Sequence, residues 1–431
     1  MDAPVGPNLA HPDSLIRLTS TVLRFRCPKM TAKSKKINFL NAFRTVGSHP
    51  STQSVLKTAN STRDYLYKSL DTGKKDAPHK TIVSAAQKYI TPIHQLLVAC
   101  RVQPENARLD ERLVFEWSTG IEDKERSFQS EAIMYELVMA IATEAMATAG
   151  VGTDECTNGE FAAACRCFKK ASGIFDYLSS TQLPQWLSKG GKIDNDALPA
   201  EAKVAVCEAF KVLMCGIAQQ MAVATLLMKD GTPNWSLLAK LSLGISEQFK
   251  EFVSIMRSKA SFTKTRIDPE FFTLMTFQIE LQHSLSFYFH ARHFWEKELE
   301  YGLGIAMMNK AISMTKTRDT PTSRGLPEIK SKSPLKSVEK DLNGVKSHMR
   351  IVLQAWEKDN SIVYFDKVPL DLPRDKVLSE GTQMMKPDPY ELDVPEPVAL
   401  IMPDSDNPPP PPNTDDDAEL ARQLQEQLNA E

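Results

Sequence analysis

Apolar side chains recur at spacings of three and four residues along most of the chain, which is the pattern of amphipathic helices. This pattern predicts helices over residues 81–102, 128–149, 158–178, 197–227, 235–256, 269–314 and 338–358. Several exceed the average helix length, and a long helix cannot bury its apolar face alone. We therefore expect a mainly α fold whose helices stack on their neighbours as in a solenoid.

One short segment alternates instead. Residues 112–118 place Leu113, Phe115 and Trp117 on one face, which predicts a strand that ends at Thr119-Gly120. Clusters of glycine, proline and polar residues predict breaks at 71–77, 150–158, 189–196, 229–233 and 316–336. The expected fold is a helical body with a small β element near residue 115.

The composition changes after residue 385. Ten of the 27 prolines lie between Pro387 and Pro412, and such a segment cannot bury enough apolar surface to form a core. We therefore expect a folded domain over residues 1–385 and a disordered, acidic, proline-rich tail over 386–431. Its five consecutive prolines, 408–412, are a polyproline-helix candidate or a plain spacer.

The end of the tail has an amphipathic pattern of its own. Four residues form its apolar stripe, after a run of acids at 415–419: Leu420, Ala421, Leu424 and Leu428. Acids at the start of a helix are favourable because that end is electropositive. The pattern resembles a ubiquitin-interacting motif, and a plain amphipathic tail is the alternative.

Charge is unevenly distributed along the chain. The 52 Lys and Arg nearly balance the 54 Asp and Glu, for a net charge of −2. From Pro387 onward, 12 acids stand against the single base Arg422, a net of −11, so the rest carries −2 − (−11) = +9. The near-neutral total gives no case for nucleic-acid binding. A basic run near the N-terminus is a candidate contact for an anionic membrane, or simply a solvated face: Arg24, Arg26, Lys29, Lys33, Lys35 and Lys36.

Motifs for catalysis are sparse. The sequence has no phosphate-binding loop, no Gly-x-Gly-x-x-Gly and no Gly-x-Ser-x-Gly. Four residues on one predicted helix are the best metal candidates: Glu280, His283, His290 and His293. A carboxylate-bridged metal bundle needs a second Glu-x-x-His, which is absent, so we favour packed histidines and expect neither metal nor cofactor. An enzyme built on a helical bundle is the competing class.

The seven cysteines form no Cys-x-x-Cys pair, and the first thirty residues lack a signal-peptide core. Both observations favour reduced thiols and a cytoplasmic protein. No cysteine stands near the C-terminus, so a prenyl anchor is not expected.

Five sequence segments, in order, resemble the BRO domain (Bro-one domain) family. They are FEWSTGIEDKERSFQSEAIMYELVMAIAT at 115–143, FKKASGIFDYL at 168–178, IAQQMAV with WSLLAKLS at 217–223 and 235–242, EKELEYGLGIAMMNKAI at 296–312, and DNSIVYFDKVP at 359–369. The resemblance is closest to stand-alone Brox-like members and to the N-terminal domain of Alix.

The resemblance implies a boomerang-shaped helical scaffold around a tetratricopeptide-like core, without enzymatic activity. Its implied function is that of an adaptor, cytoplasmic and peripheral at endosomal membranes, that binds the C-terminal amphipathic helix of an ESCRT-III subunit. Such recognition needs an exposed apolar stripe. The matching stretch offers five residues at helical spacing: Phe210, Leu213, Met214, Ile217 and Met221. We expect them to form the binding stripe, and a core face is the alternative.

Overall fold

The computed structural model describes residues 11–22, 24–31, 37–71, 78–122, 126–188, 197–318, 325–329 and 334–402. The α-helices of these segments are α1 (Asp13–Thr19), α2 (Phe39–Ala42), α3 (Pro50–Leu70), α4 (His79–Val102), α5 (Ile133–Thr157), α6 (Phe161–Tyr177), α7 (Leu183–Ser188), α8 (Val204–Leu227), α9 (Trp235–Ser258), α10 (Ser261–Lys264), α11 (Pro269–His293), α12 (Tyr301–Met314) and α13 (Glu339–Asp359). The mainly α fold predicted from the sequence is confirmed.

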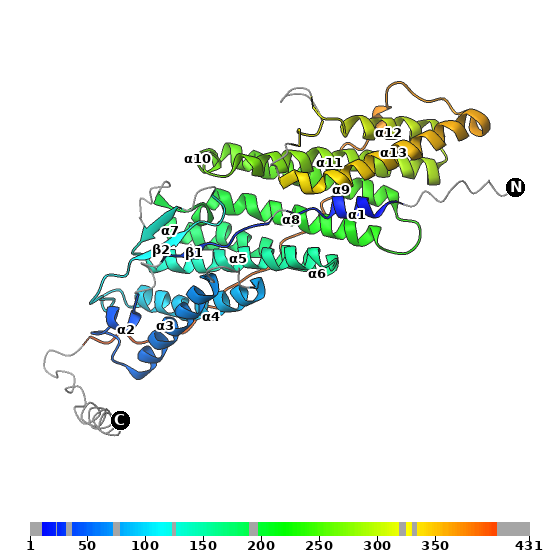
Figure 1. The fold of residues 1–431 in the computed structure, drawn as a ribbon. Coiled ribbons are helices and arrows are strands. Elements are labelled where there is room, and N and C mark those ends of the chain that lie inside the picture. Colours follow the sequence, from blue (N-terminus) through cyan, green and yellow to red (C-terminus); the bar gives the residue numbers. More distant parts are fainter. Residues whose placement is uncertain are drawn as a thin grey trace, which may run out of the picture.

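The long helices form a stacked array in chain order. Each of α3, α4, α5, α6, α8, α9, α11, α12 and α13 packs against the next. The array is elongated, with α3 and α4 at one end and α12 and α13 at the other (Figure 1). Helices α5 and α8 are long and apolar enough to cross a membrane by length and composition, but 94% and 72% of their most apolar windows are buried inside the protein. Their composition therefore matches that of core helices.

A small antiparallel sheet lies beside the array, with the order β1 (Lys29–Met30), β2 (Phe115–Ser118), β3 (Ser127–Ser130). Trp117 pairs with Met30 on one side and with Phe128 on the other. Its indole nitrogen donates to Glu136 Oε2 at 2.6 Å, and Arg63 Nε donates to Glu136 Oε1 at 2.8 Å. This buried carboxylate therefore ties the sheet to α3 and α5. The small β element expected near residue 115 is present.

Several predicted boundaries differ from the structure. Residues 128–130, predicted as the start of a helix, belong to β3 because they pair with β2. The predicted break at 150–158 is wrong, since α5 runs to Thr157 with neighbours packed around it. The predicted helix over 269–314 divides at Leu299, whose φ of 57° reverses the chain between α11 and α12. Helix α3, rich in Ser and Thr, was not predicted.

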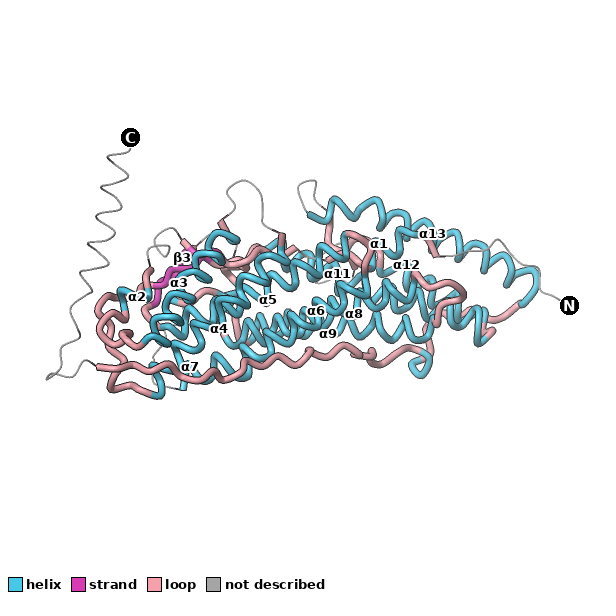
Figure 2. The backbone as a smooth tube through the Cα atoms, turned by 90° about the horizontal axis from the view of Figure 1, so that it is seen from below, coloured by secondary structure: helices cyan, strands magenta, loops and turns pink. Residues whose placement is uncertain are grey.

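The chain after α13 crosses the array in an extended conformation. We call residues 381–402 the strap; it is the long loop that follows the helices in Figure 2. Backbone amides of Thr382, Asp388 and Ile401 donate to the carbonyls of Lys240, Lys169 and Val46. Val398 and Leu400 are buried in the core. The expected domain boundary at residue 385 is therefore too early, because the folded body continues to Met402.

Candidate docking groove

The five residues expected to form the exposed stripe lie in the core. Phe210, Leu213, Met214 and Met221 are 0% exposed and Ile217 is 1% exposed. Helix α8 packs between α6 and α9 and also contacts α1, so the face that carries this stripe is covered by other helices. The stripe at helical spacing is a core face, and the expectation of an exposed surface there is corrected.

Other predicted contacts lie outside the described residues. These are the tail residues Leu420, Ala421, Leu424 and Leu428, the prolines 408–412, and Lys33, Lys35 and Lys36 of the basic run. Ubiquitin binding and contact with an anionic membrane stay predictions from the sequence. Arg24, Arg26 and Lys29 of the same basic run are described, and all three are exposed.

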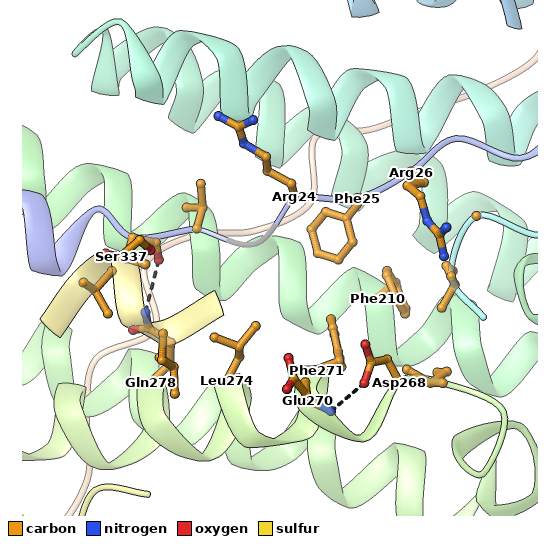
Figure 3. A pocket seen from close by; sticks show the side chains of 17 residues that line it. Arg24, Phe25, Arg26, Phe210, Asp268, Glu270, Phe271, Leu274, Gln278 and Ser337 are labelled. Carbon is orange, nitrogen blue, oxygen red and sulfur yellow. Dashed lines mark hydrogen bonds between the residues drawn. The ribbon is translucent and has the colours of Figure 1, made fainter. Parts of the chain in front are cut away.

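The structure offers a different apolar surface, which we call the Phe25 groove. Its volume is about 450 Å³. It lies between the segment that follows α1, the first turns of α11, and the 3-10 turn η6 (Pro334–Val338) (Figure 3). Its apolar lining consists of Val22, Phe25, Ile121, Phe210, Ile267, Phe271, Leu274, Leu335 and Val338. Phe25, Phe271 and Leu274 are half-buried, so their side chains are accessible to a partner.

Aromatic side chains hold the floor of the groove. The Phe25 ring lies 5.8 Å from Phe210 and 6.3 Å from Phe271, measured between ring centroids. Behind them, the ring centroid of Phe252 lies 5.8 Å from those of both Phe210 and Phe271. Edge-to-face aromatic pairs are stabilising beyond the area they bury. Phe210 is thus the one residue of the expected stripe that lines the groove, from below.

The segment that follows α1 forms the N-terminal wall of the groove. Buried glutamines of α8 and α11 hydrogen-bond to its backbone and to the end of α1. Gln278 Nε2 of α11 donates to the Thr21 carbonyl at 3.2 Å (Figure 3). Gln220 Nε2 of α8 donates to Gln278 Oε1 at 3.1 Å and to the Thr19 carbonyl at 3.3 Å. Buried amides with partners of this kind fix the backbone that they contact. The backbone at Thr19 and Thr21, at the start of this wall, is therefore held by α8 and α11.

Both signs of charge border the groove. Arg24 and Arg26 stand on the N-terminal wall, and Asp268 and Glu270 stand at the start of α11 (Figure 3). Arg26 Nη2 donates to the Glu122 carbonyl at 3.1 Å. Burial raises the pKa of the Glu122 carboxyl, and Arg266, which pairs with it, acts in the opposite direction. An apolar floor with charged borders suits an amphipathic helix that carries polar residues along its edges.

His290 of α11 is buried among aromatic rings, as the sequence favoured, and His283 and His293 are half-buried. The His290 ring lies 4.5 Å from Phe294, measured between centroids, and burial lowers its pKa to about 4. Arg292 donates to the Tyr288 hydroxyl, whose oxygen lies 3.1 Å from His348 Nε2. Among the described residues, no three His, Cys, Asp or Glu side chains come together as metal ligands.

Sequence reasoning missed most of the groove because its walls come from distant segments. The start of α11 did carry a signal in the sequence. Phe271, Phe272 and Leu274 lie on more than one face of this helix. A helix that is apolar on several faces either is buried all round or exposes a binding surface.

These features define a helical scaffold of stacked hairpins that carries a preformed apolar groove. The chain belongs to the BRO1-like domain family, whose model matches residues 33–407. The sequence-based resemblance to the BRO domain family is therefore confirmed.

Solved structures share this fold at low sequence identity. One, described as an ALIX BRO1 CHMP4C complex, has 15% identity and a TM-score of 0.62 over 88% of this chain and 99% of its own. Another, on endosomal targeting by the Bro1 domain, has 16% identity and a TM-score of 0.64 over 86% and 93%. A third, ALIX with a SIVmac239 late-domain peptide, has 14% identity and a TM-score of 0.63 over 88% of this chain and 50% of the longer ALIX chain. No curated protein matches the sequence.

Proposed function

We propose that this protein is a non-enzymatic adaptor that binds the C-terminal amphipathic helix of an ESCRT-III subunit in the Phe25 groove. Membership of the BRO1-like family supports the adaptor role. One of the similar structures is a complex of the ALIX BRO1 domain with CHMP4C. The cellular setting that accompanies this role is the cytoplasmic face of endosomal membranes, in line with the endosomal targeting named for a second structure.

The half-exposed apolar floor carries the proposal. Phe25, Phe271 and Leu274 present adjacent apolar side chains at the surface, and Gln278 holds the backbone at Thr21, in the same segment as Phe25. Apolar side chains that are already fixed lose little conformational entropy on binding, so more of the burial free energy appears as affinity. The mixed charges of Arg24, Arg26, Asp268 and Glu270 would then set the orientation of the bound helix.

The test is calorimetric titration of the full chain with ESCRT-III C-terminal helix peptides. Leu274→Asp places a charge in the groove at a half-buried position, and we expect it to weaken binding by at least about tenfold, or roughly 1.4 kcal/mol. Ile351→Asp is the matched control, because Ile351 is 56% exposed on α13 and does not line the groove. Equal binding by a folded Leu274→Asp protein and the wild type would exclude this groove as the docking site.

A further inference from the structure

A second apolar depression lies at the turn between α9 and α10. We call it the Trp186 cleft; its volume is about 310 Å³, and its apolar lining includes Leu183, Trp186, Leu198, Val204, Ala260 and Phe262. Phe262 at its edge is 53% exposed. The Phe25 groove does not share any of these residues.

The titratable side chains among the described lining residues of this cleft are both lysines, Lys203 and Lys259. Lys203 Nζ donates to Thr263 Oγ1 at 3.0 Å and lies 5.9 Å from the Phe262 ring centroid. Lys259 Nζ pairs with Glu208 at 2.6 Å, and its side chain is 55% exposed. The stretch 252–267 has four bases and no acid, and one of the four, Arg266, pairs with the buried Glu122. An apolar cleft with this border suits an acidic amphipathic segment.

This chain has such a segment beyond the last described residue. Residues 403–431 carry eight acids and one base, a net of −7. The stripe Leu420, Leu424, Leu428 follows the acids at 415–419, so an acidic end and an apolar face are combined in one short stretch. An isolated helix of this length is marginal in water and needs a surface to pack against.

The strap ends where such a segment can reach the cleft. The Leu400 amide donates to Gln103 Oε1 at the C-terminal end of α4, and the Ile401 amide donates to the Val46 carbonyl in the loop before α3. The cleft lies at the C-terminal end of α9, and Lys259 contacts Glu208 near the start of α8. Because α4, α5, α6, α8 and α9 alternate in direction, both places are at the same edge of the array, the edge that also carries α7 and α10 in Figure 1.

The distance along this edge is four helix spacings, or about 32–40 Å at 8–10 Å each. Residues 403–414 are 12 residues long, and five of them are the prolines 408–412. At about 3.1 Å per proline in a polyproline helix and about 3.3–3.6 Å for each other residue, the extended linker spans about 39–41 Å. A nearly extended linker therefore spans the distance from Gln103 to the cleft.

We propose that residues 415–428 of this chain dock in the Trp186 cleft as a short amphipathic helix. Leu420, Leu424 and Leu428 pack on Trp186 and Phe262, and the acids at 415–419 face Lys259 and the bases around it. The contact is intramolecular, and it is independent of the function proposed above because it uses another surface.

The test is hydrogen exchange on the full chain, with the free peptide 413–431 as the reference. In the docked state, amides of residues 418–428 exchange at least about tenfold more slowly than in the peptide, because only docking protects so short a helix. The cleft variant Lys259→Glu with Phe262→Ser brings the rates back to those of the peptide. The control variant Lys358→Glu with Ile351→Ser, on exposed positions of α13, keeps the protection.

A second variant leaves the folded body unchanged. A triple variant, Asp415→Asn with Asp416→Asn and Asp417→Asn, removes three charges from the tail. The reference peptide carries the same substitutions. We expect the ratio of the exchange rate in the peptide to that in the protein to fall severalfold. The proposal is overturned if the wild-type tail exchanges like the peptide, or if protection survives in the cleft variant. Protection that grows with protein concentration also overturns it, since the tail would then come from another copy.

Discussion

At the scale of single residues, burial decides what an apolar pattern means. Ile217 sits in a stripe at helical spacing that fits a partner-binding face or a core face equally well. In the structure Ile217 is 1% exposed, so no partner can contact it without rearrangement of α8. The half-exposed residues that do line a groove, Phe25 and Leu274, have less regular surroundings in the sequence.

This burial gives a prediction for Ile217→Asp. A carboxylate placed in the core without a partner should lower the free energy of unfolding by more than about 3 kcal/mol or prevent folding. Ile217→Val, which removes one methyl group, should cost about 0.5–1.5 kcal/mol. Denaturant titration of both variants measures the difference. A stable Ile217→Asp protein, within about 1 kcal/mol of the wild type, would show that solvent reaches this position.

At the scale of elements, close backbone contacts fix the strap on the helices. A Cβ on Gly173 of α6 would lie 1.7 Å from the Asp388 carbonyl oxygen, and a Cβ on Gly244 of α9 would lie 2.3 Å from that of Thr382. Both helices can approach the strap this closely because glycine has no side chain. The ion pair of Lys169 with Asp388 and the bond from the Tyr390 hydroxyl to Glu144 Oε2 add polar contacts.

Gly173→Ala should therefore displace the strap while leaving α6 helical. We expect the Asp388 amide, which donates to the Lys169 carbonyl at 3.2 Å, to lose most of its protection from hydrogen exchange. Gly344→Ala on α13 is the control, because its Cβ would meet the Ser14 side chain, 3.0 Å from Oγ and 3.2 Å from Cβ, and no atom of the strap. There the alanine should leave the exchange of the Asp388 amide unchanged. Unchanged exchange at Asp388 would contradict the close contact.

At the scale of the whole molecule, the strap joins distant parts of the array. It contacts α9 through Thr382, α6 through Asp388, and the loop before α3 through Ile401. Contacts between residues so far apart in sequence restrict the relative movement of helices that otherwise contact only their neighbours, as in other repeat-like arrays.

Two truncations test this role. A chain that ends at residue 385 lacks the buried Val398 and Leu400, and each buried aliphatic side chain contributes about 1.5–3 kcal/mol. We expect that chain to unfold at clearly lower denaturant concentration than the full protein. A chain that ends at residue 402 keeps the strap and should unfold close to the full-length midpoint. Equal stability of the two truncations would mean that residues 386–402 add little to the fold.

The sequence by itself determined the helical class, a strand that ends at residue 118 and the family, because these depend on local periodicity and on short motifs in a fixed order. The tertiary structure decided which apolar stripe is buried, where α11 ends, and where the folded body stops. The physical reason is that periodicity identifies an apolar face of a helix but not the element that packs against it. The segment after α1 that forms one wall of the Phe25 groove, and the strap, both lie more than a hundred residues from the helices they contact.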